Sequence, residues 1–598
     1  MQNENKQAKT AVEVAEVLEQ IAQLLELQGE NPFKIRAYIG AARALEFLSE
    51  PLEKIVSEGR LGEIAGIGKA INEKITELMT TGRLPYYEEL RNQFPAALFE
   101  LFELQGLGAK KIKLLYEKLG VASVVDLEKA CHSGAVAELP GFGVKSAANF
   151  EKAIAFHRQQ AGLFRIDQVS ESAEELLQAL RAHPDVGQCQ TAGSFRRHKE
   201  ALHDLDLLVS STKPEAVSNF FVHHPLVEAI LMQGPTKSSV LLKGGLQCDL
   251  RVVKSEEFPF ALVYFTGSKE HNIRLRNRAL EQGWSLNEYR FTQVEEKKGR
   301  PSKDLPSKIH DEQELYQSLG LDFIPPELRE DRGEVLAAAE RRLPKLVDWM
   351  QLKGTFHCHT KASDGQNTLV EMAAAAQELG LQYLGIADHS KSSHQAHGLS
   401  EERLAEQITE IHQLNKTFED FRLFAGTECD ILKDGSLDFS DEVLASLDYV
   451  VASVHSSFTM GEVAMTDRII RAMENRYMTM LGHMTGRILF SRASYSVNVP
   501  ALLDAAAATG TIIELNANPR RLDMDWRWWF LAKEKGVRCV INPDAHTTLG
   551  LQNLTYGVGI ARKGWLTKDD VINTLPTQKV MEVLNKKKIA TKEGGKLN

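Results

Sequence analysis

The chain has 598 residues, of which 43% are apolar and 25% charged, and a formal net charge of −10. The length predicts several globular domains, and the acidic balance excludes a protein that coats nucleic acid, so any DNA contact must be local. Six scattered cysteines with no Cys-x-x-Cys pair exclude a disulfide framework and a zinc ribbon. A polar N-terminus and the lack of a membrane-length apolar run predict a bacterial-type cytoplasmic protein with no membrane partner.

The first 160 residues are predicted to be helical and to repeat one turn pattern. A glycine, an apolar residue and a second glycine open a helix, lysine follows within two residues, and such turns leave backbone amides free to bind phosphate. One copy could equally be a helix-capping turn, whereas three copies with lysines favour binding of the DNA backbone. This is the helix-hairpin-helix pattern. Its residues are Gly66, Gly68 and Lys69; Gly106, Gly108, Lys110 and Lys111; and Gly141, Gly143 and Lys145.

A glycine-containing turn and a pair of carboxylates follow in a stretch predicted to alternate strands and helices. Gly193 and Ser194 allow an anion to approach closely, and Arg197 can hold a phosphate through two donors. Asp204 and Asp206 stand two residues apart in an apolar strand, so both carboxylates face one side. A solvated pair at a strand end is the usual explanation of Asp-x-Asp alone. The turn upstream favours a Mg²⁺ site beside a triphosphate.

This combination resembles the nucleotidyltransferases of DNA polymerase family X. Asp249 supplies a third carboxylate, and Tyr264-Phe265-Thr266-Gly267-Ser268 is followed by Asn272 and Arg276. The resemblance implies that two Mg²⁺ or Mn²⁺ ions are held by Asp204, Asp206 and Asp249. It implies that Tyr264 and Phe265 flank the sugar of a dNTP, Asn272 contacts the minor-groove edge and Arg276 reaches the template. Two departures from the family pattern are His203, where glycine is usual, and Lys269. The residues implied to bind nucleotide are Ser194, Arg197, Tyr264, Phe265, Gly267, Asn272 and Arg276.

The first hairpin also resembles the lyase region of DNA polymerase beta. Lys74 stands where that protein has a Schiff-base lysine, and Lys34 and Tyr38 match its 5′-phosphate pocket. Ala70 and Phe33 depart from the lysine and histidine expected there. Amine attack needs a neutral lysine with a lowered pKa. The departures therefore favour a solvated helix lysine at position 74, and the 5′-phosphate pocket is the better preserved part.

The second half of the chain places metal-ligand residues after a series of short apolar runs, most of which precede a helical stretch. Such a β/α repeat directs side chains at the strand ends to one end of a barrel. A lone histidine on a strand is usually a core residue, but a repeated series with carboxylates indicates a multinuclear metal site. The residues are His357, His359, Asp364, His389, Glu428, His455, His483, Asp544 and His546.

The order of these residues resembles the polymerase and histidinol phosphatase (PHP) domain, a distorted seven-stranded barrel with up to three Zn²⁺ or Mn²⁺ ions. The resemblance implies one metal at His357, His359, Glu428 and Asp544, and a second at Asp364, His389 and His546. Glu428 would bridge to a third metal held by His455 and His483. Arg487 is a candidate phosphate contact.

Together these features predict a multidomain α/β protein. The predicted parts are a helical lyase-like DNA-binding domain (1–85), helix-hairpin-helix fingers (86–160), a nucleotidyltransferase palm (161–254), an α/β thumb (255–330), a linker (331–352), the barrel (353–580) and a basic tail (581–598).

The resemblances imply a repair polymerase that fills gaps, with 3′–5′ exonuclease and abasic-site endonuclease activity, in base excision repair. Its implied partners are gapped or nicked DNA with a 5′-phosphate, dNTPs, a DNA ligase and other repair proteins, and we expect a monomer. Two alternatives are a nuclease or phosphatase tethered to DNA by a weakly active polymerase module, and a non-enzymatic scaffold for DNA ends. The complete set of palm aspartates, Asp204, Asp206 and Asp249, favours the enzyme with both activities.

Overall fold

The computed structural model describes residues 11–46, 52–64, 66–104, 106–294, 304–306 and 308–590. The chain divides into an N-terminal unit, Met1–Ala161 with Phe490–Ala493, and a C-terminal unit, Gly162–Leu489 with Ser494–Asn598. Among the helices in these described ranges, none combines the length and apolarity needed to cross a membrane.

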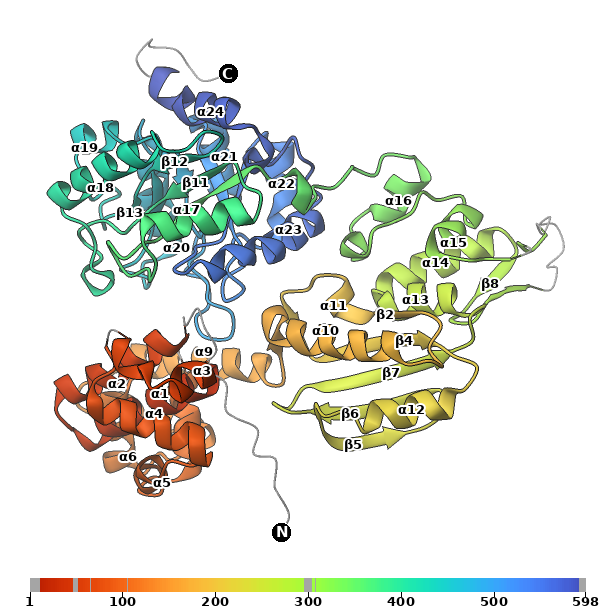
Figure 1. The fold of residues 1–598 in the computed structure, drawn as a ribbon, viewed down its shortest axis with the longest axis horizontal. Helices are drawn as coiled ribbons and strands as arrows, with labels where there is room; N and C mark the ends of the chain where they lie inside the picture. The colour runs from red at the N-terminus through yellow and green to blue at the C-terminus, as the bar shows by residue number, and fades with distance from the viewer. Residues whose placement is uncertain are drawn as a thin grey trace. The chain divides into compact units, whose positions relative to one another are not determined.

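The N-terminal unit is helical, as the apolar periodicity predicts (Figure 1). Its buried residues form one cluster that runs from Val14 to Ile154. The predicted boundary at residue 85 therefore separates two parts that share a core. The elements are α1 (Ala11–Gln28), α2 (Pro32–Glu46), α3 (Leu52–Ser57), η1 (Arg60–Glu63), α4 (Lys69–Thr81), α5 (Pro85–Arg91), η2 (Ala96–Glu103), α6 (Ala109–Leu119), α7 (Val124–His132), α8 (Ala135–Glu138) and α9 (Val144–Gln160).

The palm is a mixed sheet in the order β2-β4-β7-β6-β5, visible in Figure 1. Strand β4 is parallel to β7, and Asp206 lies opposite Asp249. Leu205 and Leu207 are fully buried and alternate with the two partly exposed aspartates of β4, as predicted. The elements are β1 (Phe164–Arg165), α10 (Ile166–Ala182), β2 (Cys189–Thr191), α11 (Gly193–Arg196), β3 (Ala201–Leu202), β4 (Asp204–Ser210), α12 (Pro214–Val222), β5 (Val227–Gln233), β6 (Lys237–Leu242) and β7 (Gln247–Val253).

The thumb follows with its own hydrophobic cluster, and the predicted linker contributes to it. Ala338 and Leu346, both within 331–352, are buried among thumb residues such as Leu315. The segment is therefore packed against the thumb. The elements are α13 (Phe258–Thr266), α14 (Lys269–Glu281), β8 (Trp284–Leu286), β9 (Phe291–Gln293), α15 (Glu312–Ser318), η3 (Pro326–Leu328), α16 (Glu334–Ala339) and η4 (Trp349–Gln351).

The remaining residues form a barrel of parallel strands. In the described part of the chain the strands form runs of three and five. Strand β12 pairs with β11, and β13 pairs with β14. Only Gly426 and Thr427 separate the end of β12 from the start of β13. If β12 and β13 are counted as one interrupted strand, the barrel has the predicted seven. Its strands are β10 (Gly354–Cys358), β11 (Tyr383–Ile386), β12 (Arg422–Ala425), β13 (Glu428–Asp430), β14 (Val451–Ser453), β15 (Met480–Leu481), β16 (Ile512–Asn516) and β17 (Cys539–Asn542).

Helices surround these strands in Figure 1. They are α17 (Leu369–Glu378), η5 (His394–Ala396), α18 (Glu401–Leu414), α19 (Asp441–Ala445), α20 (Glu462–Glu474), α21 (Val499–Thr509), η6 (Trp526–Trp528), α22 (Trp529–Glu534), η7 (Leu549–Asn553), α23 (Leu554–Lys563), η8 (Ile572–Thr574) and α24 (Thr577–Ala590).

Aromatic rings fill the barrel interior below the ligand residues. Phe356, Tyr383, Phe424 and Tyr449 are fully buried and pack ring against ring. A Cβ atom added at Gly385 would overlap two of these rings, which explains the need for glycine in that strand. The packed rings form a floor, so polar side chains at the strand ends lie above a closed core.

The last helix, α24, belongs to the barrel. Val580 and Leu584 are buried in the same cluster as the aromatic floor. The predicted boundary at residue 580 falls inside this helix, so residues 581–590 are corrected from tail to barrel. The basic composition of residues 581–590 concealed the apolar position, Leu584, that packs there against the barrel. Residues 591–598 of the predicted tail lie outside the described residues.

Candidate metal centres and DNA-binding turns

Glu428 stands at the centre of the barrel ligands. Its carboxylate is buried at the start of β13, just after the break that splits the strand. Five histidines approach it, which makes Glu428 the most shared anion among the described ligand residues. The distances from its carboxylate oxygens are 3.3 Å to His357 Nε2, 3.7 Å to His359 Nε2, 3.0 Å to His389 Nδ1, 3.2 Å to His455 Nε2 and 2.9 Å to His483 Nε2.

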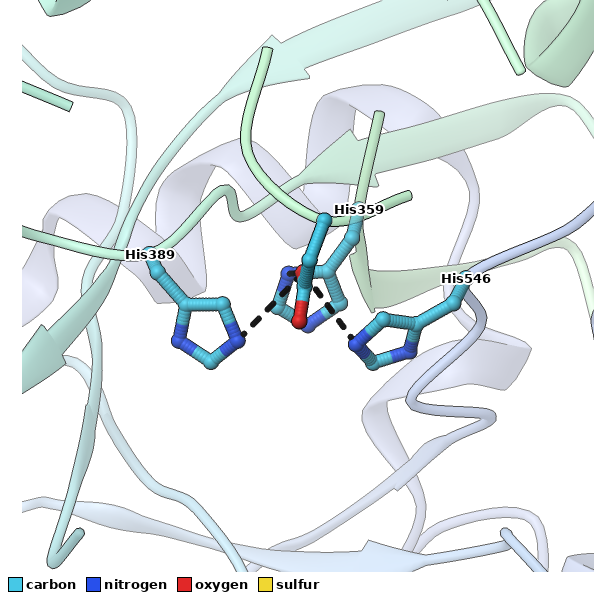
Figure 2. A group of neighbouring side chains, drawn as sticks. His359, His389 and His546 are labelled. Atoms are coloured by element: carbon cyan, nitrogen blue, oxygen red, sulfur yellow. Dashed lines mark ion pairs between the residues drawn. The ribbon is translucent and has the colours of Figure 1, made fainter. Parts of the chain in front are cut away.

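A second group gathers around Asp364. Figure 2 shows His389 and His546 directed at one carboxylate oxygen, and His359 lies beside them. The distances to Asp364 Oδ1 are 3.6 Å from His389 Nε2, 3.4 Å from His546 Nε2 and 3.8 Å from His359 Nδ1. This group matches the predicted second metal position, with His359 as an additional neighbour.

Asp544 completes the set. Its Oδ1 lies 3.6 Å from His357 Nε2 and 3.4 Å from His359 Nε2. Both His357 and Asp544 have a positive φ, at 57° and 50°, a conformation that non-glycine residues adopt rarely and that is found repeatedly at active sites.

Ligand residues of the barrel fall into three sets, given at the end of this paragraph, and within each set the ligand atoms lie less than 4.8 Å apart. The first set contains three of the four residues predicted for the first metal and lacks Glu428. The third set contains His389, whereas His483 was predicted at that metal. The division of ligands among metals therefore stays a prediction. The sets are His357, His359 and Asp544; His359, Asp364, His389 and His546; and His389, Glu428 and His455.

The chemistry of these donors fits metal ions. Several buried ring nitrogens make no hydrogen bond of good geometry in the described structure, even where a Glu428 oxygen lies close. Such a state is costly unless another group uses their lone pairs. Zn²⁺ and Mn²⁺ accept the mixture of imidazole and carboxylate ligands present here. The nitrogens are His357 Nε2, His359 Nδ1 and Nε2, His389 Nδ1 and His483 Nδ1.

Two carboxylates that sequence reasoning missed orient the histidines. Glu514 Oε2 lies 2.5 Å from His357 Nδ1, and Asp430 Oδ1 lies 2.6 Å from His455 Nδ1. Each contact leaves the Nε2 atom of the histidine directed at Glu428. Such outer carboxylates fix the tautomer and raise ligand basicity. One sequence signal was available for Glu514, because it is a lone carboxylate in the apolar strand β16.

Electrostatics in the barrel follow from this packing. Burial opposes a charge on His455, yet the carboxylates of Glu428 and Asp430 outweigh it and raise its pKa to about 10. Burial likewise opposes ionisation of Glu428, yet the histidines around it hold its pKa well below the usual value. His455 and Glu428 therefore each favour the charged form, whereas burial lowers the pKa of His483 and favours its neutral form.

Arg487, the candidate phosphate contact, has partners within the barrel. Its guanidinium donates to the backbone oxygens of Arg521, at 2.8 Å, and Leu522, and lies 3.1 Å from Asp525. These donors hold the loop that follows β16, and the phosphate contact stays a prediction.

In the palm, the aspartates lie on neighbouring strands beside the glycine turn. A Cβ atom at Gly193 would overlap the carboxylate of Asp206, and Gly193 has a φ of 60°. Only glycine fits there. Asp249 is ion-paired with Lys237 at 2.7 Å and accepts from Gln247 at 3.0 Å. The turn therefore lies directly against the carboxylate pair, as the sequence predicts.

The charges of the palm aspartates interact strongly. Burial, followed by the neighbouring Asp204 and Asp249 carboxylates, raises the pKa of Asp206 to about 7. Burial favours the neutral form of Asp249 as well, but its hydrogen bonds to Lys237, Gln247 and Ser239 lower its pKa. A divalent cation between the aspartates would relieve the repulsion.

Several of the predicted nucleotide-binding residues are engaged by neighbouring groups of the protein. Arg197 is 8% exposed, donates from Nε to Glu330 at 3.0 Å and from Nη1 to the carbonyl of Thr266. Asn272 donates to the carbonyl of Tyr264 at 2.7 Å, and the Tyr264 and Phe265 rings pack edge to face at 5.2 Å. Ser194 is half-buried, Gly267 has a φ of 69°, and Arg276 is exposed.

The helix-hairpin-helix turns share one geometry. In each, the first glycine has a positive φ and the second precedes a helix whose N-terminus has no side-chain cap, which leaves amides for an anion. The lysines that follow (Lys69, Lys110, Lys111 and Lys145) are exposed. The first glycines are Gly66 (92°), Gly106 (84°) and Gly141 (91°), and the second are Gly68, Gly108 and Gly143.

Two of the lyase-like residues, Lys34 and Lys74, lie over the ring of Tyr86, a residue that sequence reasoning missed. The amines of Lys34 and Lys74 lie 5.9 and 4.8 Å from the centre of the Tyr86 ring. Tyr38 is buried, and burial together with Tyr86 raises its pKa. Lys74 also donates to the carbonyl of Ala70 at 3.3 Å. Tyr86 thus brings the predicted phosphate pocket and the candidate lysine together.

Comparisons with known proteins agree with this arrangement. Family models match for a helix-hairpin-helix domain (residues 10–84), a DNA polymerase beta thumb (261–330) and a PHP domain (355–518). The DNA polymerase/3′-5′ exonuclease PolX of Bacillus subtilis is 38% identical over 94% of this chain and 97% of its own. DNA polymerase lambda of Rattus norvegicus is 26% identical over 53% of this chain and 56% of its own. A protein of Thermoanaerobacter sp. (strain X514) named "Probable phosphatase" is 28% identical over 40% of this chain and 97% of its own.

Proposed function

Because this chain belongs to the family X DNA polymerases that carry a C-terminal PHP domain, we propose that it both extends and trims DNA primers. The palm would fill short gaps by template-directed nucleotidyl transfer, and the barrel would act as a 3′–5′ exonuclease and abasic-site endonuclease. The observation that carries the proposal is the pair of separate carboxylate centres, Asp206 with Asp249 in the palm and Glu428 among five histidines in the barrel.

In the palm, Asp204, Asp206 and Asp249 would hold two Mg²⁺ or Mn²⁺ ions. Such ions supply charge stabilisation for the attacking and leaving oxygens of a phosphoryl transfer. Ser194 and Arg197 would donate to the triphosphate, and Tyr264 and Phe265 would flank the sugar. Arg197 must first release Glu330, to which it is bound here.

In the barrel, the nine predicted ligands would hold Zn²⁺ or Mn²⁺. Ions of this kind lower the pKa of a water molecule and hold a phosphate. The contribution of the protein is orientation: Glu514 and Asp430 fix His357 and His455, and Glu428 is the anion shared among the histidines. Their fixed geometry supports phosphoester hydrolysis in preference to a purely structural role.

The N-terminal unit would supply affinity for gapped or nicked DNA. Its uncapped turns bind backbone phosphates without reading sequence, and Lys34 and Tyr38 would hold a 5′-phosphate. Lys74 is retained as a candidate lyase residue. This assembly suits base excision repair by a monomer in the bacterial cytoplasm, at the nucleoid, followed by a DNA ligase.

One observation favours a second function. A stretch that makes up 40% of this chain matches 97% of a protein named "Probable phosphatase", and we assign that match to the barrel. The barrel would then remove 3′-phosphates while a weakly active palm tethers it to DNA.

A single assay separates these functions. The protein is incubated with a labelled one-nucleotide-gapped duplex and Mn²⁺, with and without dNTP. We expect the primer to lengthen with dNTP and to shorten without it. A primer that never lengthens, and loses only a 3′-phosphate when one is supplied, would support the phosphatase alternative.

A further inference from the structure

The barrel reaches the nucleotide-binding turn of the palm through a buried lysine. Lys563, the last residue of α23, is fully buried at its side chain. Its Nζ donates to the backbone carbonyl of Arg197 at 2.9 Å and to Glu330 Oε1 at 2.6 Å. The amine of Lys563, in the barrel, therefore contacts both Arg197 of the palm and Glu330 of the thumb.

Glu330 is shared between two cations. Besides Lys563, its Oε1 accepts from Arg197 Nε at 3.0 Å, and its side chain is only 10% exposed. Lys199 lies further away, at 3.8 Å. The charge of one nearly buried carboxylate is thus divided mainly between Lys563 and Arg197.

Neighbouring contacts fix this arrangement. A Cβ atom at Gly559, one turn before Lys563, would overlap the His198 ring. Glu200 lies 3.8 Å from Arg487 and 3.7 Å from Arg527, both of the barrel. Buried apolar residues of palm and barrel, such as Leu205 and Leu554, belong to one hydrophobic cluster. The turn is therefore held against the barrel along several of its residues.

We propose that Lys563 is a positioning residue for the polymerase site. By compensating the charge of Glu330, it weakens the hold of Glu330 on Arg197 and lets the guanidinium exchange that carboxylate for the triphosphate of an incoming nucleotide. The physical reason is that a nearly buried carboxylate deprived of one of two cations binds the other more tightly. The inference rests on the proposed role of Arg197 in nucleotide binding.

Steady-state primer extension on the gapped duplex tests this inference in the full chain. Lys563→Met should raise the KM for dNTP roughly 5–20-fold, a coupling typical of charges in one network, and leave kcat within about twofold. Lys563→Arg should retain the KM. Lys568→Met, a substitution at an exposed lysine of the same domain, serves as the matched control and should not change it.

The double variant Lys563→Met/Glu330→Gln makes the test specific. Removal of the uncompensated carboxylate should return the KM to within about threefold of the wild-type value. A general packing defect would not be rescued, so failure of rescue would overturn the route through Glu330. An unchanged KM in Lys563→Met would overturn the proposal outright.

Two further variants keep the outcomes separate. Glu330→Gln alone should not raise the KM for dNTP, because the carboxylate that holds Arg197 is then neutral. A raised KM in this variant would contradict the proposal. This variant is the test to use if Lys563→Met does not fold. Arg197→Ala tests the proposed nucleotide site itself. If Arg197→Ala keeps the wild-type KM for dNTP, the assignment of Arg197 to the nucleotide site has failed. If Arg197→Ala raises the KM but Lys563→Met does not, only the inference about Lys563 has failed.

Discussion

The two carboxylate centres of this protein are built in opposite ways. In the barrel, ligand atoms fall into three groups, within each of which they lie less than 4.8 Å apart, and histidines such as His357 are fixed by outer carboxylates. In the palm, Asp249 is occupied by Lys237, and the three aspartates form no comparably close group among the described residues. The barrel centre is therefore preorganised, whereas the proposed palm site would require Asp249 to exchange Lys237 for a cation. Substitutions confined to one centre should reveal that difference.

The largest expected effect is at the shared anion of the barrel. Glu428→Ala should lower primer shortening and cleavage at abasic sites together, by at least ~10²-fold, because neutral histidines cannot offset the repulsion of neighbouring divalent ions. The variant should also bind less metal per chain, measured by elemental analysis. Primer extension should persist, and its loss would show that the two centres are not independent.

The mirror-image substitution is Asp249→Ala. We expect nucleotide incorporation to fall at least ~10²-fold, as for loss of a metal ligand or base, with primer shortening retained. Both activities are measured on one preparation with the labelled gapped duplex. Extension at the wild-type rate would refute the palm assignment.

Glu514→Gln probes preorganisation directly. It keeps the size of the side chain but weakens the bond that orients His357, and outer-shell changes of this kind typically cost about 10–100-fold in metal affinity or activity. Competition with a chelator measures the affinity. The control is Glu442→Gln, at an exposed glutamate of the barrel, and equal metal affinity in both variants would contradict the orienting role.

The palm should instead be sensitive to protons. With its pKa raised to about 7, Asp206 is increasingly protonated below that pH, so binding of Mn²⁺ should weaken by up to about tenfold per pH unit. The difference in Mn²⁺ binding between the wild type and Asp249→Ala, titrated between pH 8 and 6, isolates the palm. Since the folded state holds this proton more tightly than the unfolded chain, the contribution of Asp206 to the free energy of unfolding should fall as pH rises from 3.8 to about 7.

The smallest effect should be on affinity alone. Replacing Lys110 and Lys111 by alanine should weaken DNA binding for all sequences and reduce its salt dependence, by about one unit of slope for each DNA phosphate that is no longer neutralised. Fluorescence titrations at several salt concentrations measure the slope. An unchanged slope would place these lysines away from DNA.

The sequence predicted those parts of each centre that depend on local spacing. The alternation in β4 placed Asp204 and Asp206 on one face, and the repeated strand ends predicted the barrel ligands. It could not reveal partners that long-range packing selects. Glu330 meets Arg197 across 133 residues, and Glu514 meets His357 across 157. A carboxylate in a strand or loop carries no local mark of which cation it will meet.

The aromatic floor of the barrel has a kinetic consequence. Phe356, Tyr383, Phe424 and Tyr449 close the interior below the ligand residues, so ions bound there would enter and leave by the end that also admits the substrate. A DNA end bound in that opening would block the exit of the ions. Metal removal by a chelator should therefore slow when DNA is bound, and the enzyme would retain its ions longest while at work.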